Sequence, residues 1–264
     1  MTTREFFSTI IFLFSLMAVL SLVELVIPLF ARDQRSRGRL IANLGLTAVT
    51  LVLNWGLSSA AAVIALVLSQ RRGLLVPLAL PLPALIAISV VTLDLFTYLA
   101  HLTMHKIPSL WRIHSIHHSD PFLDVSTTLR QHPMEGIWRL LWIIIPVWIL
   151  GLPASGVVVY RLLSSGNALF EHANIRFWQP LDRVLSLVWT TPNMHKIHHS
   201  RAPEQTDSNY GNILALFDRG FRTFTPTEQA LSVIYGLEDS DSKREKSFPG
   251  LMMLPFARSW HDHS

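Results

Sequence analysis

The sequence predicts an all-α integral membrane protein, a helical bundle that carries a histidine-rich helical cap. Half of the 264 residues are hydrophobic and only 15% are charged, whereas soluble domains typically carry about 25% charged residues. The chain contains about four long apolar segments, which we expect to form helices in lipid. Ten of the twelve histidines lie between positions 101 and 199, mostly at helical spacing.

The first three apolar segments are each long enough to cross a bilayer as a helix. Phe6–Phe30 is interrupted only by Glu24, which we interpret as an interfacial or helix-packing residue. Leu40–Gln70 contains no charged residue. Three prolines delay the third helix, which is predicted from about Leu82 to His101.

The fourth apolar segment, Leu140–Tyr160, is broken by Pro146 and again by Gly151–Pro153. A single span and a hairpin that enters and leaves on the same side both fit this pattern. We expect N-terminal membrane helices over residues 1–81, a catalytic domain over 82–235 and a charged C-terminal tail over 236–264. The tail segment Glu238–Lys246 is expected to be exposed.

Arginine placement predicts how the chain is oriented in the membrane. Four arginines lie between the first two segments, at positions 32, 35, 37 and 39, and two lie between the second and third, Arg71 and Arg72. The positive-inside rule then places residues 31–39 in the cytoplasm, and by alternation His101 and the histidine-rich cap as well. We attribute the net charge of +4 to this bias, and we expect no nucleic-acid partner.

Three histidine motifs have the spacing of metal ligands. One is an H-x3-H and two are H-x2-H-H, and each places two or three imidazoles on one face of a helix. Eight imidazoles exceed the four ligands of a zinc site, so we predict two metal ions. His132 is a candidate further ligand or pocket residue, with a structural role as the alternative. The predicted ligands are His101, His105, His114, His117, His118, His195, His198 and His199, with His172 as a ninth.

The motifs and their surroundings resemble the fatty acid hydroxylase superfamily, also called the sterol desaturase family. The resemblance covers roughly residues 90–225, and the three motifs in combination are highly specific. Beyond the histidines it rests on Pro108–Arg112, Ser119–Asp120, Ser126–Thr127, Arg130–Glu135, Thr191–Met194, Asn209–Gly211 and Leu216–Phe224.

The resemblance implies a non-haem centre of two iron ions, dioxygen as co-substrate, and a lipid that is hydroxylated or desaturated. The sequence departs from the family at Phe217, where a tryptophan is usual, and at Arg222, where a glycine is usual. Some relatives carry a histidine pair near position 172, whereas here Ala168 stands four residues before His172. The resemblance therefore leaves a tenth ligand unassigned.

Carboxylates and amides should orient the imidazoles, and electrons should come from a separate protein. The chain has no cysteine and no glycine-rich dinucleotide loop, so a small cytochrome or ferredoxin with its reductase is implied. Basic residues such as Lys106, Arg112, Lys196 and Arg201, expected to be exposed, are interpreted as ordinary surface charge. The candidates that would orient the imidazoles are Asp94, Asp120, Asp124, Asn174, Asn193 and Asp207.

Two alternative functions fit a membrane protein with clustered histidines. A membrane zinc hydrolase is disfavoured because the chain has no His-Glu-x-x-His helix and has too many clustered histidines. A metal transporter or metal-binding membrane protein is disfavoured because the histidine motifs lie beyond the ends of the apolar segments, which hold few charges.

Overall fold

The computed structural model describes residues 3–30, 37–69, 73–237 and 247–256. Within these residues the chain is helical and has no strand, only isolated bridges. This confirms the all-α class. The five long helices are α1 (Thr3–Val26), α2 (Arg37–Ser69), α3 (Leu82–Lys106), α5 (Pro133–Leu150) and α6 (Ala154–His172).

These long helices form a bundle because their side chains are apolar almost all round. The helix α2 packs against α5 and α6, and α3 packs against the same two helices. Three helices are long and apolar enough to cross a membrane, over Gly38–Val67, Leu82–Lys106 and Pro133–Leu150. A shorter apolar helical stretch, Ile10–Val26, lies along α6 and covers one side of the bundle.

The third helix begins where the prolines predict and continues past His101. Pro81 has extended backbone at the N-cap, and Pro83 lies in the first turn, where its missing N–H is tolerated. The helix ends at Lys106, so it presents His105 as well as His101. Pro108 then begins the next helix, α4 (Pro108–His118), after a single residue in extended conformation.

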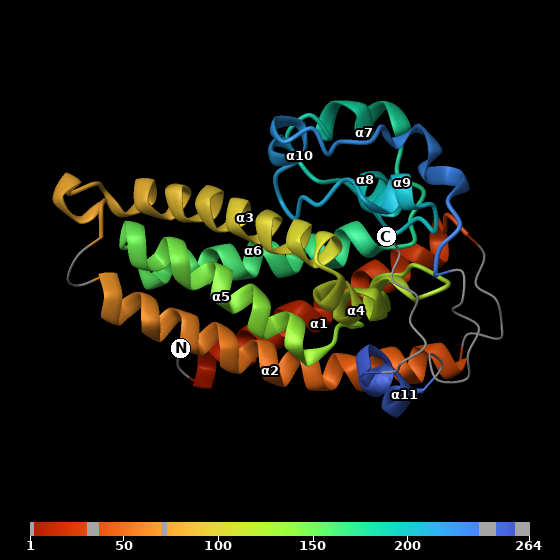
Figure 1. Ribbon diagram of the computed structural model, residues 1–264, viewed down its shortest axis with the longest axis horizontal. Helices are drawn as coiled ribbons and strands as arrows, with labels where there is room; N and C mark the ends of the chain where they lie inside the picture. The colour runs from red at the N-terminus through yellow and green to blue at the C-terminus, as the bar shows by residue number, and fades with distance from the viewer. Residues whose placement is uncertain (1–2, 31–36, 70–72, 238–246, 257–264) are drawn as a thin grey trace.

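The fourth apolar segment forms a hairpin, one of the two predicted alternatives. Pro146 does not break it, because α5 continues through this residue, where losing one backbone hydrogen bond is tolerated in a packed apolar helix. The turn falls at Gly151, whose φ of 72° favours glycine. A Cβ on Gly151 would also meet the backbone of Gly73 at 2.8 Å. The N-terminus of α5 and the C-terminus of α6 therefore lie at the same end of the bundle (Figure 1).

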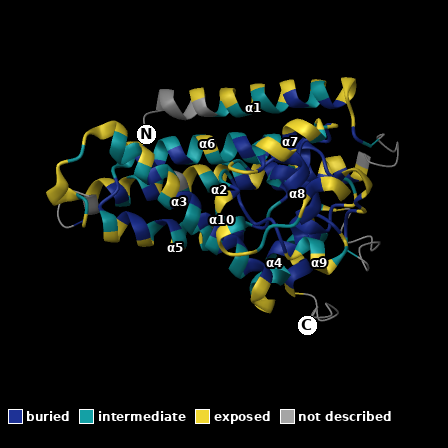
Figure 2. Cartoon of the chain, turned by 90° about the horizontal axis from the view of Figure 1, so that it is seen from above, coloured by how far each residue is buried: buried dark blue, intermediate teal, exposed yellow. Residues whose placement is uncertain are grey.

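The cap lies at this end and consists of short helices and loops (Figure 1). Its inner parts are the second half of α4, where residues 114–118 are buried, and α8 (Pro192–His198), which is buried throughout, as Figure 2 shows. The remaining cap elements are η3 (Val125–Leu129), α7 (Gln179–Leu185), α9 (Pro203–Thr206), α10 (Leu216–Gly220) and η4 (Thr227–Ser232), and a short 3₁₀ turn, η2 (Val76–Leu78), precedes α3.

The first helix is joined to the cap through Glu24. This carboxylate is 2% exposed, and its Oε1 accepts hydrogen bonds of 2.8 Å from the backbone N–H groups of Val125 and Asn174. Glu24 therefore has the packing role expected of it. A buried carboxylate is stable here because it satisfies two backbone donors that would otherwise have no partner.

Part of the C-terminal region folds back onto the bundle. The helices α11 (Phe248–Met253) and η6 (Leu254–Phe256) bury Leu251 and Leu254 against Leu46 of α2 and Ile116 of α4. This stretch of the predicted charged tail is therefore packed against the bundle. The charged segment 238–246 lies outside the described residues.

Candidate metal centre

Nine histidines converge in the cap and form two adjacent groups. Within each group the ring nitrogens that could bind a metal ion lie within 4.8 Å of one another, and every ring is buried. The first group, here called the five-histidine group, contains His101, His105, His114, His118 and His198. The second, the four-histidine group, contains His117, His172, His195 and His199.

Each H-x2-H-H motif contributes to both groups. On α4, His114 and His118 are one turn apart and belong to the five-histidine group, while His117 belongs to the other. The second motif is divided in the opposite sense. His198 belongs to the five-histidine group, and His195 and His199 belong to the four-histidine group. The rings of His118 and His199 stack at a centroid distance of 4.4 Å where the groups meet.

The hydrogen bonds on the outer nitrogens orient the rings. Nδ1 of His101 lies 2.9 Å from the carbonyl of Tyr210, and Nδ1 of His198 lies 2.7 Å from that of Ser208. Since a carbonyl only accepts, each Nδ1 carries the proton and each Nε2 presents a lone pair. His172 is held in the same way by the carbonyl of Ala168 at 2.7 Å.

The inward nitrogens then face one another across short distances. Nε2 of His101 is 3.1 Å from Nε2 of His114, and Nε2 of His172 is 2.9 Å from Nε2 of His195. Among the described residues, Nε2 of His105 and Nε2 of His198 have no hydrogen-bond partner. Lone pairs gathered in this way repel one another unless a cation lies between them, so the donor set fits bound metal.

The electrostatics favour the form of histidine that binds metal. Burial, reinforced by the neighbouring imidazoles, lowers the pKa of the cap histidines well below the usual range. Their rings are therefore neutral at neutral pH, as a metal ligand must be. This applies to His114, His117, His118, His195, His198 and His199.

Two glutamates that the sequence analysis did not select lie against the histidines. Glu135 Oε2 lies 2.9 Å from Nδ1 of His114, and Glu171 Oε1 lies 3.9 Å from Nδ1 of His195. Both carboxylates are buried and sit near the cap ends of apolar helices. The sequence signal for these glutamates is a charged residue at the end of an apolar segment, because a carboxylate in such a place needs a partner.

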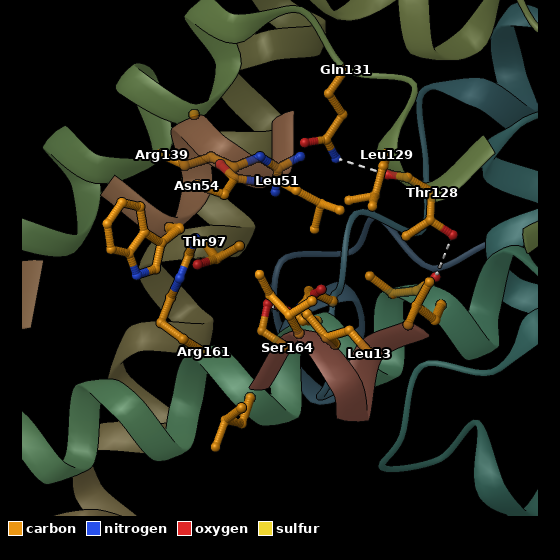
Figure 3. Close-up of a pocket in the computed structure, with 18 of the residues that line it drawn as sticks. Leu13, Leu51, Asn54, Thr97, Thr128, Leu129, Gln131, Arg139, Arg161 and Ser164 are labelled. Carbon is orange, nitrogen blue, oxygen red and sulfur yellow. Dashed lines mark hydrogen bonds between the residues drawn. The ribbon is translucent and has the colours of Figure 1, made fainter. Parts of the chain in front are cut away.

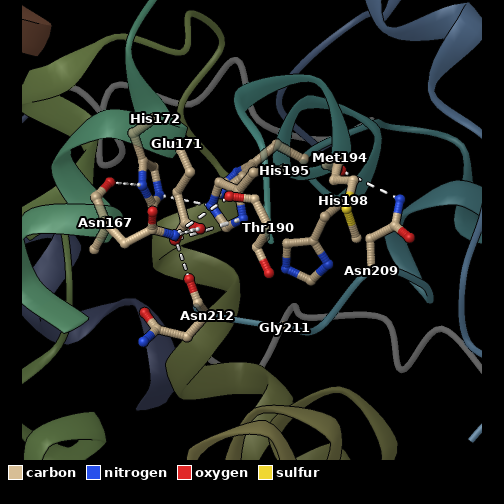
Figure 4. Close-up of polar contacts among 12 residues, drawn as sticks. Asn167, Glu171, His172, Thr190, Met194, His195, His198, Asn209, Gly211 and Asn212 are labelled. Atoms are coloured by element: carbon tan, nitrogen blue, oxygen red, sulfur yellow. Dashed lines mark hydrogen bonds and ion pairs between the residues drawn. The ribbon is translucent and has the colours of Figure 1, made fainter. Parts of the chain in front are cut away.

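A polar network supports Glu171 (Figure 4). Asn167, one turn before it, donates from Nδ2 to Glu171 Oε2 at 3.2 Å and to the carbonyl of Asn212. The indole N–H of Trp189 donates to Asn167 Oδ1 at 2.6 Å. The network fixes the end of α6 against the loop between α9 and α10, and thereby positions the four-histidine group.

The residues predicted to orient the imidazoles have varied surroundings. Asp207 Oδ1 lies 3.4 Å from Nδ1 of His105. Asp94 instead accepts from the backbone N–H groups of residues 213 and 214. Asp120 and Asp124 both bind Arg39. Asn174 exchanges hydrogen bonds with the backbone of Phe30, and Asn193 donates to residues 177 and 179.

Two further predicted positions lie apart from the histidine groups. His132 is in neither group, and its Nδ1 accepts from the backbone N–H of Met134 at 3.3 Å, which caps α5. Lys196 is buried rather than exposed, because its ammonium donates to the carbonyl of Ile175 at 2.9 Å. Burial lowers the pKa of Lys196 to about 7.

A cavity of about 180 Å³ adjoins the four-histidine group inside the bundle (Figure 3). It is lined by residues of α1, α2, α5 and α6, most of them apolar. Ala168, whose carbonyl accepts from His172, and Thr97, one turn before His101, belong to the lining. The cavity therefore comes within one helical turn of a histidine in each group.

Comparison with known proteins places these motifs in a family. Residues 86–223 match the family model described as fatty acid hydroxylase. The chain is 29% identical over 179 residues to an ornithine lipid hydroxylase of Rhizobium tropici, which covers 67% of this chain and 52% of that protein. It is 34% identical over 149 residues to an alkylglycerol monooxygenase of Danio rerio, covering 54% and 31%.

The alkylglycerol monooxygenase of Caenorhabditis elegans is similar at 30% identity over 151 residues, which cover 56% of this chain and 28% of that protein. The matches thus span about half or less of the length of these curated relatives. No solved structure is significantly similar to the chain.

Proposed function

This chain belongs to the fatty acid hydroxylase family, and from that premise we propose that it is a membrane-bound oxidoreductase that hydroxylates a lipid with dioxygen at a centre of two iron ions. The observation that carries the proposal is the division of nine buried imidazoles into groups of five and four. Two groups of this size suit two metal ions, whereas a single zinc ion takes about four ligands.

The protein residues hold and orient the metal ligands. His101, His198 and His172 are fixed by backbone carbonyls, and His114 is fixed by Glu135. These contacts direct the Nε2 lone pairs inward and increase the basicity of the imidazoles. When bound, iron supplies the redox chemistry that activates dioxygen and attacks an unactivated C–H bond, which side chains alone do not provide.

A lipid is the proposed substrate because the cavity beside the four-histidine group is largely apolar and lies between the long helices. The names of the relatives agree with this class, since they refer to alkylglycerol and to ornithine lipid. Because the metal-binding end is buried, the bound lipid would react away from bulk water.

We further propose that the cap faces the cytoplasm and receives electrons from a separate small cytochrome or ferredoxin with its reductase. The arginines at positions 32–39 support the cytoplasmic placement. A separate donor is proposed because the given sequence has no cysteine and no dinucleotide-binding loop.

The test combines metal analysis with product analysis. The full chain, purified in detergent, is expected to contain about two iron ions per chain, in line with two ligand groups. Given a reductant and a lipid extract, it should consume dioxygen and yield lipids heavier by one oxygen atom in mass spectrometry. His198→Ala should abolish the product. A chain with a single zinc ion and no dioxygen uptake would overturn the proposal in favour of a hydrolase.

His132→Asn is the matched control, because asparagine retains an acceptor that can cap α5. Since His132 lies in neither histidine group, this variant is expected to keep the iron content and the product. Loss of iron in His132→Asn would instead make His132 the tenth ligand.

A further inference from the structure

The cavity beside the four-histidine group contains two positive charges. Arg139 of α5 and Arg161 of α6 both line it, and Figure 3 shows their guanidinium groups pointing into the space between the helices. The described lining contains no aspartate or glutamate. The other polar lining residues, among them Asn54, Gln131 and Ser164, are uncharged.

The described contacts of Arg139 leave its charge only partly compensated. Its Nη2 lies 3.8 Å from Oε2 of Glu135, and this oxygen is also 2.9 Å from Nδ1 of His114. One carboxylate is thus shared between an arginine and an imidazole. Among the described residues, Nε of Arg139 has no hydrogen-bond partner.

Two arginines on one cavity of a membrane bundle indicate an anionic ligand. A guanidinium group is costly to place among apolar helices, and arginines found there are usually paired or functional. Both guanidinium groups point into the same cavity, where like charges repel each other. A carboxylate or phosphate between them would relieve both costs, because the planar fork of arginine matches two oxygens of either group.

We propose that the cavity binds a lipid with an anionic oxygen group, a carboxylate or a phosphate, which lies between Arg139 and Arg161 while the hydrocarbon lies on the apolar lining. As a statement about substrate, this rests on the proposed hydroxylase function. It selects a charged lipid over a neutral sterol, carotenoid or alkylglycerol. Anchoring the charged group would also fix which carbon atoms lie toward Thr97 and Ala168, at the end of the cavity near the histidines.

The experiment compares ligands that differ only in their polar group. Hexadecanoic acid, hexadecyl phosphate and hexadecanol are titrated into the full chain in detergent, and dissociation constants are measured by native mass spectrometry. At least one of the two anions is expected to bind about tenfold or more tightly than the alcohol, because only an anion can pair with both guanidinium groups. The acid and phosphate arms identify which anion is preferred.

The variants locate this preference in the cavity. Arg161→Gln should remove the preference for the anion, and Arg161→Lys should retain part of it, since lysine keeps the charge but not the fork. Arg183→Gln is the matched control, because this arginine is largely exposed on α7 and pairs with Glu228. It should leave the preference unchanged.

Equal binding of acid, phosphate and alcohol to the unaltered chain would overturn the proposal, even if a variant does not fold. An anion preference that survives unchanged in a folded Arg161→Gln variant would overturn it as well. Binding does not require turnover. Absence of any hydroxylated product would therefore count against the proposed reaction. It would not affect the binding measurement, which tests the anion preference alone.

Discussion

The five-histidine and four-histidine groups differ in how many rings they contain and in how firmly those rings are held. In the first group, His101, His114 and His198 each have a close outer partner, at 2.7–2.9 Å. In the second, His172 has such a partner, whereas Nδ1 of His195 has no hydrogen bond among the described residues and lies 3.9 Å from Glu171.

The cavity comes close to both groups, because Thr97 lies one turn before His101 and Ala168 lies one turn before His172. Ala168, which lines the cavity, holds His172 through its carbonyl. With four imidazoles rather than five, the four-histidine group would leave a bound metal ion more room for an exogenous ligand, as catalytic metal sites require. The difference suggests that the five-histidine group serves mainly to hold its ion and the four-histidine group to admit ligands.

Removing one ring from each group should give the largest and most unequal effects. His118→Ala leaves four imidazoles in its group, and His199→Ala leaves three. We expect His118→Ala to retain both iron ions with reduced affinity. His199→Ala should lose one of the two ions and all product. This effect is larger than the loss of up to about 100-fold in metal affinity that is expected when an outer hydrogen-bond partner of a ligand is removed. Iron per chain, measured by mass spectrometry, checks this.

The two positions provide their own control, because their rings stack against each other at 4.4 Å. Any general damage to this part of the cap should affect both variants alike. Equal loss of iron from the two variants would show that the groups do not differ in completeness.

Removing the outer carboxylates should have a smaller effect, and again an unequal one. Glu135→Gln disturbs a contact of 2.9 Å and is expected to weaken iron binding by about 10- to 100-fold. Glu171→Gln alters a contact of 3.9 Å that is too long for a hydrogen bond, and it should cost less than about tenfold. Competition with a coloured chelator measures both affinities. A larger loss for Glu171→Gln would reverse the ranking.

Much of the centre could be predicted from sequence because its ligands repeat at helical spacing. The three motifs identify eight of the nine converging histidines, and His172 was selected from its place after an apolar segment. The division of each motif between two groups was not evident, because it depends on how α4 and α8 are turned toward each other. Spacing fixes which rings share a face, but not which ion that face meets.

The outer partners were harder to predict because they come from distant parts of the chain. Glu135 is 21 residues from His114. Asp120, close to a histidine motif in sequence, instead binds Arg39, 81 residues away. Proximity in sequence therefore does not reveal these partners, whereas a charge at the end of an apolar helical segment marks both glutamates as candidates.

The smallest effect is expected at Asp207, the predicted orienting residue that does contact a histidine ring. Burial would raise the pKa of its carboxyl, but the neighbouring His105 ring and Lys106 ammonium outweigh burial and lower that pKa to about 2. Asp207 is thus ionised at neutral pH, and Asp207→Asn removes a full charge. Its side chain is nevertheless 42% exposed, and water screens its interaction with His105.

We therefore expect Asp207→Asn to weaken iron binding by less than about threefold, below either glutamate variant. The same chelator competition measures it, with Lys106→Met as the companion variant, since that change frees the carboxylate from its other partner at 2.5 Å. If Asp207→Asn weakened iron binding as much as Glu135→Gln, solvent exposure would not explain how much each carboxylate contributes to iron affinity. His105 would then depend on its outer partner as strongly as His114 does.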